Sequence, residues 1–189
     1  LELPLDFKRP VIQTHRGKIC RFEFSKQHSQ LLITFGKNNA CGYFTVLQAL
    51  LNVLIYKITS QKDIIIGAPV SGRNHSEFHQ TVGFFVNTIA LRNKINPTED
   101  FLALVRQIDK TFAEAYDHQF YPFDLLIENL ELERDFSRSP IFDIFTSFQK
   151  AESLATQPSF LQIQNYSVPI EISRFDLMRS EERRVGKEC

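Results

Sequence analysis

The chain has 189 residues, with 22 Lys and Arg against 22 Asp and Glu, and 43% of its residues are apolar. That length fits one ordinary domain or part of a larger one, and the apolar content suffices for a packed core. Eighteen Phe and only 23% charged residues exclude a disordered chain. A net charge of zero argues against nucleic-acid binding, and no apolar run is long enough to suggest a membrane partner. Three cysteines form neither a disulfide framework nor a zinc cluster, which favours a cytoplasmic location.

Both ends of the sequence predict that it is part of a longer protein. The first residue is Leu1, and the only Met is Met178. The last eleven residues (179–189, RSEERRVGKEC) carry seven charges and no aromatic residue, unlike the sequence before them. We therefore expect 179–189 to be a non-native tail, with a genuine charged terminus as the alternative.

The first half of the chain predicts one linker, one strand and two helices. Prolines predict a linker over 1–10, and alternating apolar residues predict a strand over 18–24. Ser25 predicts the start of a helix that runs to about residue 38. An almost continuous apolar run over 44–58 predicts a helix nearly enclosed by the core. The side chains expected to be buried in the first helix are Leu31, Leu32 and Phe35, and the second helix carries a narrow polar stripe of Thr45, Gln48 and Asn52.

The second half predicts strands interleaved with helices. Consecutive β-branched residues predict a buried strand over 63–70, followed by a turn at 71–72 and a second strand over 83–95. Thr98 predicts a helix start that is followed by acidic residues, and this helix should end near Gln119, before Tyr121-Pro122. Its apolar face consists of Phe101, Val105, Ile108, Phe112 and Ala115. A short helix is expected over 123–130, and further strands over 141–148, 160–163 and 173–177. The predicted class is an α/β or α+β layered domain, with a mixed sheet packed with helices.

Searches for common catalytic patterns identify no strong candidate. His75 and His79 are four residues apart, which would place two imidazoles on one helix face, as zinc sites require. The intervening Glu is one position too late for the metalloprotease pattern, so two loop histidines are favoured. No G-x-S-x-G elbow surrounds Ser71 or Ser137. Cys20 and Cys41 fit small buried apolar residues better than thiolate nucleophiles.

Longer patterns are more informative. Residues 82–92 (VGFFVNTIALR), 118–124 (HQFYPFD) and 134–142 (RDFSRSPIF) resemble the GxFVNTxxxR, HQDxPFE and RDxSRNPLF motifs of the condensation domain of nonribosomal peptide synthetases. They occur in the order typical of that family, and 63–73 (DIIIGAPVSGR) and 3–10 (LPLDFKRP) add support. The resemblance covers residues 1–178. The sequence departs from the motifs at Phe120, where the family often has Asp, and at Asp124 and Ser139, where it has Glu and Asn. Leu5 and Phe7 depart from the linker pattern.

The resemblance implies an acyltransferase fold of two similar lobes, related to chloramphenicol acetyltransferase. In that family two phosphopantetheine arms enter a tunnel between the lobes, and an acceptor amine attacks a donor thioester to form an amide. The catalytic H-H-x-x-x-D-G motif of the N-terminal lobe is absent here, so we expect 11–178 to be a C-terminal lobe that is inactive alone, with 1–10 as the inter-lobe linker. The implied partners are that N-terminal lobe, upstream and downstream peptidyl carrier domains and an adjacent adenylation domain, with no cofactor bound directly. A non-catalytic platform that binds carrier proteins and a stand-alone acyltransferase remain alternatives.

The motifs also nominate residues for the tunnel wall or the scaffold, none of them catalytic or metal-binding: Asn87, Arg73, Gly83, His118, Arg134 and Asp135. Asn87 either faces the tunnel, in which case Asn87→Ala slows condensation and leaves stability nearly unchanged, or is a buried structural residue. Gly83 permits close backbone approach or marks a bulge. Arg73 either binds a phosphate or carrier acid or is a solvated loop residue. His118 should complement a helix C-terminus, and Arg134 and Asp135 should bond within the lobe.

Overall fold

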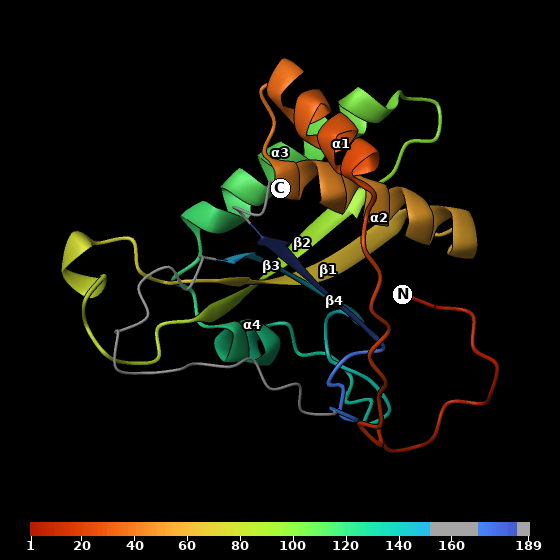
Figure 1. The fold of residues 1–189 in the computed structure, drawn as a ribbon. Helices are drawn as coiled ribbons and strands as arrows, with labels where there is room; N and C mark the ends of the chain where they lie inside the picture. Colours follow the sequence, from red (N-terminus) through yellow and green to blue (C-terminus); the bar gives the residue numbers. More distant parts are fainter. Residues whose placement is uncertain (152–169, 185–189) are drawn as a thin grey trace, which may run out of the picture.

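Four strands form a mixed sheet in the order β2-β1-β3-β4 (Figure 1). The computed structural model describes residues 1–151 and 170–184. β1 and β2 are antiparallel and pair along their whole length, whereas β1–β3 and β3–β4 are parallel. The elements are α1 (Lys26–Asn38), α2 (Tyr43–Thr59), β1 (Asp63–Val70), η1 (Ser76–Phe78), β2 (Asn87–Lys94), α3 (Phe101–Asp117), α4 (Phe123–Asn129), β3 (Ile144–Ala151) and β4 (Leu177–Arg184). The predicted class, a mixed sheet packed with helices, is confirmed.

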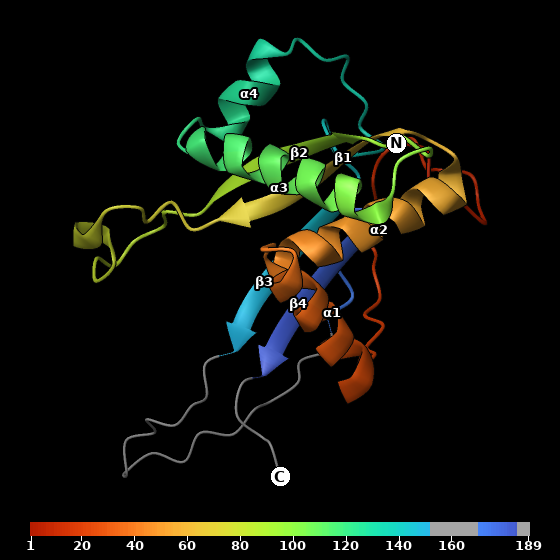
Figure 2. The same cartoon turned by 90° about the horizontal axis from the view of Figure 1, so that it is seen from above.

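Helices cover both faces of this sheet unequally. Figure 1 shows α1, α2 and α3 above the sheet and α4 below it, and Figure 2 shows α2 and α3 lying across the strands. The main core lies between α2, α3 and the sheet. Its fully buried members include Val46, Ile64, Ile66, Val105, Ile108 and Ile144. The predicted apolar face of α3 is confirmed, since Val105 and Ile108 are buried and Phe101 and Phe112 pack against the core.

The start of α1 is as predicted, but its buried strip is narrower. The Ser25 hydroxyl accepts a hydrogen bond from the His28 amide at 3.2 Å and so caps the helix. Leu32 and Phe35 pack against the core, whereas Leu31 is 60% exposed. The prediction for Leu31 is wrong because α1 contacts the core along one narrow strip that also includes the buried Gly36.

The predicted enclosure of α2 is confirmed only in part, because the helix buries apolar side chains such as Val46 and Leu51 together with its polar stripe but leaves one side exposed. Thr45, Gln48 and Asn52 are all buried. The Thr45 hydroxyl donates to Asp109 Oδ1 at 2.9 Å, the Gln48 amide donates to Thr146 Oγ1, and Asn52 Nδ2 donates to Gln48 O at 2.8 Å. Such partners lower the cost of burying these groups, although Gln48 Oε1 and Asn52 Oδ1 have no hydrogen-bond partner among the described residues. The opposite side of α2 exposes three apolar side chains, Leu50, Leu54 and Ile58.

Strand β2 begins four residues later than predicted. Its first residue, Asn87, pairs with Val70 at the end of β1. Beyond Val70 the chain turns at Gly72, whose φ is +63° and where an added Cβ would overlap the Phe85 carbonyl oxygen. Because β1 ends before this turn, residues 83–86 lie beyond the paired part of the two strands.

Other predicted boundaries also shift. The prediction of a strand over 18–24 is wrong, because these residues lie outside the sheet that the described strands form, and Phe22 is exposed. Asp100, not Thr98, caps α3, since its carboxylate accepts from the Ala103 amide at 2.7 Å. Instead of a strand over 173–177, β4 begins at Leu177, after an isolated bridge between Arg16 and Ile172.

The observed bounds of the remaining elements lie closer to the predicted bounds. α4 lies within its predicted range, α3 ends two residues before Gln119, and β3 starts three residues later than predicted. The expected strand over 160–163 lies outside the described residues. Residues 179–184, the first part of the predicted tail, form most of β4. The division into linker, lobe and tail stays a prediction.

Aromatic side chains cover the face of the sheet opposite α2 and α3. The Phe142 ring lies directly on Gly67 of β1, where an added Cβ would overlap the ring. The Phe142 ring also contacts those of Phe123 and Phe175, with centroids 5.5 Å apart in each pair. Phe145 and Phe175 stack with centroids 4.9 Å apart. These contacts connect the beginning of α4, β3 and the approach to β4.

Among the described residues, no single helix is both long and apolar enough to cross a membrane. α1 and α2 meet the length and composition criteria only when taken together, and the chain bends by 111° between them.

The contact between Gly67 and Phe142 predicts that Gly67→Ala destabilises the intact domain by about 1–3 kcal/mol, because the new methyl group must displace a packed ring. Chemical denaturation measures this loss. Gly42→Ala is the control, because its added Cβ would meet nothing closer than 3.6 Å. Phe142→Leu should recover part of the loss in the double variant, and equal stability of the two single Gly variants would contradict the prediction.

Candidate functional site

The six residues nominated by the motifs fall into three places. Asn87 and His118 lie where the first residue of β2 meets the loop between α3 and α4. Arg73 and Gly83 lie in the arm, which we define as residues 71–86 between β1 and β2. Arg134 and Asp135 lie in the turn between α4 and β3. The structure therefore brings the nominated residues together in pairs and not in one cluster.

Asn87 is a three-way connector between β2 and the loop before α4. Its side-chain Nδ2 donates hydrogen bonds to Gln119 O at 2.7 Å and to Tyr121 O at 2.8 Å. Its Oδ1 accepts from the Phe123 amide at 3.4 Å, at the start of α4. These three bonds use both functional atoms of the amide. The geometry favours the structural alternative for Asn87.

The loop that Asn87 holds also contains a buried polar side chain. Gln119 is 3% exposed, and its Oε1 has no hydrogen-bond partner among the described residues. Tyr121 accepts a hydrogen bond at its hydroxyl from Asn129 Nδ2, which ties the loop to the end of α4. His118 is the C-cap residue of α3, as the helix-terminus prediction expects, and its side chain is exposed.

Arg73 organises the arm. Its guanidinium donates to the carbonyl oxygens of Phe78 and Thr81, the latter at 2.8 Å, and to Gly83 O at 3.2 Å. The same group lies 4.2 Å from the centroid of the Phe85 ring, a cation–π contact. Three carbonyls and one ring occupy most of its donor positions, so the geometry favours a scaffold role over either predicted alternative. Gly83 lies outside β2, in this extended arm.

The histidines of the arm are part of the same scaffold. A ring nitrogen of His79 lies 3.2 Å from Arg73 O, and the His75 ring packs edge-on against Phe78. In the part of the chain that the structure describes, no group of three or more His, Cys, Asp or Glu side chains could hold a metal ion. His75 and His79 are thus not part of a three-ligand group in the described structure.

Asp135 stabilises the turn that follows α4. One carboxylate oxygen accepts hydrogen bonds from the Ser137 amide at 2.8 Å and from the Ser137 hydroxyl at 2.6 Å. The hydroxyl bond, followed by the amide bond, lowers the pKa of Asp135 below its ordinary value. Arg134 is exposed in the same turn. The prediction that these residues bond within the lobe is therefore matched by the contacts of Asp135.

Sequence reasoning missed the residues that join distant segments. Arg9 forms an ion pair with Asp176, and Arg138 forms one with Glu2 at 3.0 Å and also lies 3.3 Å from the buried Asp143, which is near it in sequence. Burial raises the pKa of Asp143 above its ordinary value, although Arg138 opposes this effect. Single charged residues so far apart in sequence give no local pattern. Only the Arg and Asp residues within the matched segments, such as Arg9 and Arg138, offered a signal.

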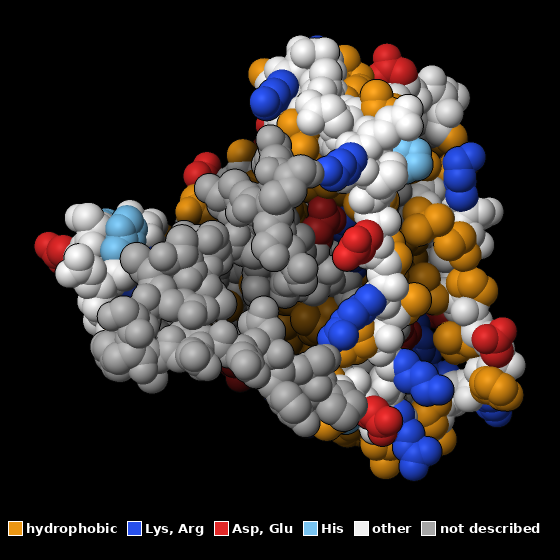
Figure 3. Space-filling view, viewed as in Figure 1, with side chains coloured by type: hydrophobic (Ala, Val, Ile, Leu, Met, Phe, Trp, Pro, Cys, Tyr) orange, Lys and Arg blue, Asp and Glu red, His pale blue; other side chains and the backbone are white. Residues whose placement is uncertain are grey.

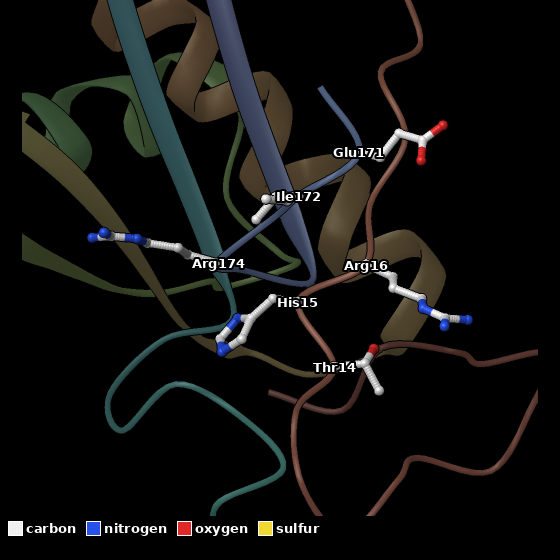
Figure 4. A pocket seen from close by; sticks show the side chains of 6 residues that line it. All are labelled: Thr14, His15, Arg16, Glu171, Ile172 and Arg174. Atoms are coloured by element: carbon white, nitrogen blue, oxygen red, sulfur yellow. The ribbon is translucent and has the colours of Figure 1, made fainter. Parts of the chain in front are cut away.

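A shallow hollow of about 410 Å³ lies beside the bridge between Arg16 and Ile172. Its lining residues are Thr14, His15, Arg16, Glu171, Ile172 and Arg174. Figure 4 shows the side chains of Arg16 and Arg174 pointing away from each other, with His15 directed elsewhere. Because the charged groups do not converge, this hollow is not a built anion site.

Figure 3 shows hydrophobic and basic side chains interspersed over the side of the molecule where the N-terminal segment runs.

Comparisons with known proteins relate this arrangement to one family. A family model described as "Condensation domain" matches residues 1–182. Tyrocidine synthase 3 of Brevibacillus parabrevis is 37% identical over 177 residues, which are 94% of this chain and 3% of that protein. Bacitracin synthase 2 of Bacillus licheniformis is 35% identical over 94% of this chain and 7% of its own length. The chain thus spans only a small part of these relatives.

Solved structures show the same fold. A four-domain nonribosomal peptide synthetase bound to AMP and glycine is 26% identical with a TM-score of 0.78, over 80% of this chain and 12% of that one. The X-domain from teicoplanin biosynthesis has a TM-score of 0.86 over 99% of this chain and 42% of its own, at 20% identity. The latter likeness concerns the fold alone.

Asn87→Ala should lower the free energy of unfolding of the intact domain by about 1–3 kcal/mol, because two carbonyl oxygens and one amide lose their partner. This expectation replaces the sequence-based one of unchanged stability. Chemical denaturation tests it, with Asn74→Ala in the exposed arm as the control. Unchanged stability of Asn87→Ala would instead support the alternative that Asn87 faces the tunnel.

Ser137→Ala should raise the pKa of Asp135 towards its ordinary value of about 4, because the carboxylate loses its strongest hydrogen bond. A lowered folded-state pKa contributes stability above the ordinary Asp pKa, and this contribution is lost as the pH falls through the lowered value. A carboxyl carbon NMR titration of the intact domain measures the change. Ser139→Ala is the control, since its hydroxyl contacts Arg174 O at 3.3 Å. An unchanged midpoint in Ser137→Ala would exclude the bond as the cause.

Proposed function

Because this chain belongs to the condensation domain family, we propose that it is the C-terminal lobe of a condensation domain in a nonribosomal peptide synthetase. The observation that carries this proposal is the match over residues 1–182, together with the packing of its motif segments around one end of the sheet. In the proposed reaction the acceptor α-amine attacks the donor thioester carbonyl. A C–N bond forms, the C–S bond breaks, and the proton released by nitrogen ends on the pantetheine thiol.

The residues of this chain contribute placement and not proton transfer in this proposal. Asn87 holds the loop before α4 against β2, and Arg73 holds the arm in one conformation. In this proposal they form part of a rigid scaffold that keeps amine and thioester in contact, and such contact accelerates a two-substrate reaction. The proposed catalytic His motif belongs to the preceding lobe. Carrier domains that bring substrates on phosphopantetheine and an adjacent adenylation domain are the proposed partners.

The surface of the arm supports a covering partner. Val82 is 99% exposed and Phe84 is 91% exposed, although both are large apolar side chains. They flank Gly83, whose carbonyl is held by Arg73, so the arm presents them from a fixed backbone. Exposed apolar groups on an ordered segment are typical of an interface. We assign this interface to the N-terminal lobe of the same domain.

Reconstitution of the intact domain tests the proposed function. Donor and acceptor carrier domains are loaded with aminoacyl groups, and intact-protein mass spectrometry follows transfer to the acceptor arm. The expected result is an acceptor arm heavier by the donor acyl group, with the donor arm free.

Two other results would contradict the proposal. Carrier binding without transfer would identify a non-catalytic platform. Transfer to a soluble amine with no acceptor carrier present would identify a stand-alone acyltransferase.

Phe84→Ser should weaken the association of the two lobes when they are produced as separate chains, because Phe84 lies in the proposed interface. Leu54→Ser on the exposed side of α2 is the matched control and should leave the association unchanged.

A further inference from the structure

The first 17 residues, which we call the strap, have almost no regular structure, yet they are bound to the lobe at three separate places. In Figure 1 the strap leaves the N-terminus, passes below the sheet and rises towards α1. Each place combines polar contacts to a different part of the fold. The positions of these three places determine where the chain can act as a hinge between this lobe and the preceding part of the protein.

The first place is at Leu1 and Glu2. The Glu2 amide donates to Gln61 Oε1 at 2.9 Å, and Gln61 Nε2 donates back to Glu2 O at 2.8 Å. Arg138 donates to Glu2 Oε1 at 3.0 Å and to Leu1 O at 2.9 Å. The side chains of Leu1 and Leu3 pack against the main core. This end of the strap is therefore attached to the loop after α2 and to the turn before β3.

The second place is Arg9. Its guanidinium forms a two-pronged ion pair with the carboxylate of Asp176, just before β4, with one N–O distance of 3.0 Å. It also donates to Ser137 O at 3.2 Å. Both charged side chains are largely buried, with 20% and 17% exposure. A bidentate pair with this burial is stronger than an ordinary surface ion pair.

The third place is the end of the strap. The Gln13 amide donates to Phe136 O at 2.8 Å, and its side chain donates to Arg174 O at 2.9 Å. The Ser173 amide donates to His15 O, and the Gly17 amide donates to Glu171 O, both at 2.8 Å. The strap is thus joined to the turn before β3 and to the segment that leads into β4.

We propose that the strap is a locked part of this lobe, with the Arg9–Asp176 ion pair as its lock, so that rotation between the two lobes occurs ahead of Leu1. This inference rests on the proposed function, because it assumes that the other lobe precedes the strap. A hinge within residues 3–8 would have to break the Glu2 contacts to Gln61 and Arg138, and a hinge within residues 10–17 would also have to break the Arg9 contacts to two segments. The lock therefore keeps the strap with this lobe and confines the rotation to the chain ahead of it.

Hydrogen exchange of the intact domain tests the lock. Arg9→Gln removes the charge that pairs with Asp176, and it should speed exchange of the Gln13 and Gly17 amides by about tenfold or more. Arg92→Gln is the matched control, because Arg92 forms a bidentate pair with Asp63 that is much more exposed. The double variant Arg9→Asp with Asp176→Arg should restore slow exchange.

A distance measurement tests the consequence for the lobes. One spin label is placed on the preceding lobe and one at the exposed Lys110→Cys on α3, with the exposed Cys20 replaced by Ser. The distance distribution should broaden in Arg9→Gln and remain as in the wild type in Arg92→Gln. If Arg9→Gln does not fold, Gln13→Ala gives a milder loosening of the same strap.

Two results would overturn the inference. One is a strap that exchanges as fast as an unbonded loop in the wild type, and the other is an equal effect of Arg9→Gln and Arg92→Gln. Failure of the proposed function is read separately, from acyl transfer by the wild-type domain. If the domain transfers the acyl group but the amides of the strap exchange freely, only the inference of a lock is contradicted. If the amides of the strap exchange slowly but no acyl group is transferred, the lock stands and the proposed function is contradicted.

Discussion

The contact between Gly67 and the Phe142 ring is the constraint on which the lower face of the sheet depends. A side chain at residue 67 would occupy the space of the ring, so a glycine in the middle of β1 is required. With the ring in place, Phe123 and Phe175 contact it from α4 and from the approach to β4. One missing side chain in the central part of the sheet therefore sets the positions of three segments that are distant in sequence.

Beyond Gly67, where β1 ends at Val70, polar contacts replace aromatic packing. The strand stops at the turn around Gly72, and the two loops beyond it are held by single side chains. Asn87 binds the loop before α4 through three hydrogen bonds, and Arg73 binds the arm through carbonyl oxygens and the Phe85 ring. Backbone groups in loops need partners, and here the motif side chains provide them. The contacts of Asn87 and Arg73 thus favour a scaffold role for these two motif residues.

The sequence predicted those elements whose signals are local. Ser25 as a cap, the β-branched strand 63–70 and the apolar face of α3 all depend on neighbouring residues, and the structure confirms them. The polar stripe of α2 was recognised, but its orientation was not, because its partners Asp109 and Thr146 lie far along the chain. The start of β2 was placed too early for the same reason, since a strand exists only where a partner pairs with it. The Arg9–Asp176 pair, 167 residues apart, had no pattern that could reveal it.

The positions where this chain departs from the motifs support the distinction between scaffold and surface. Phe120 is more than half exposed, and Asp124 is exposed on the first turn of α4, where a carboxylate suits the helix dipole as well as the usual Glu does. Ser139 retains one polar contact, to Arg174 O. The motif positions that make buried or multiple contacts, such as Asn87, Phe123, Asp135 and Phe142, all carry the family residue. Substitution is tolerated where a side chain has few neighbours. Among the described residues, none of the contacts that hold the sheet, the arm or the strap depends on one of these departures.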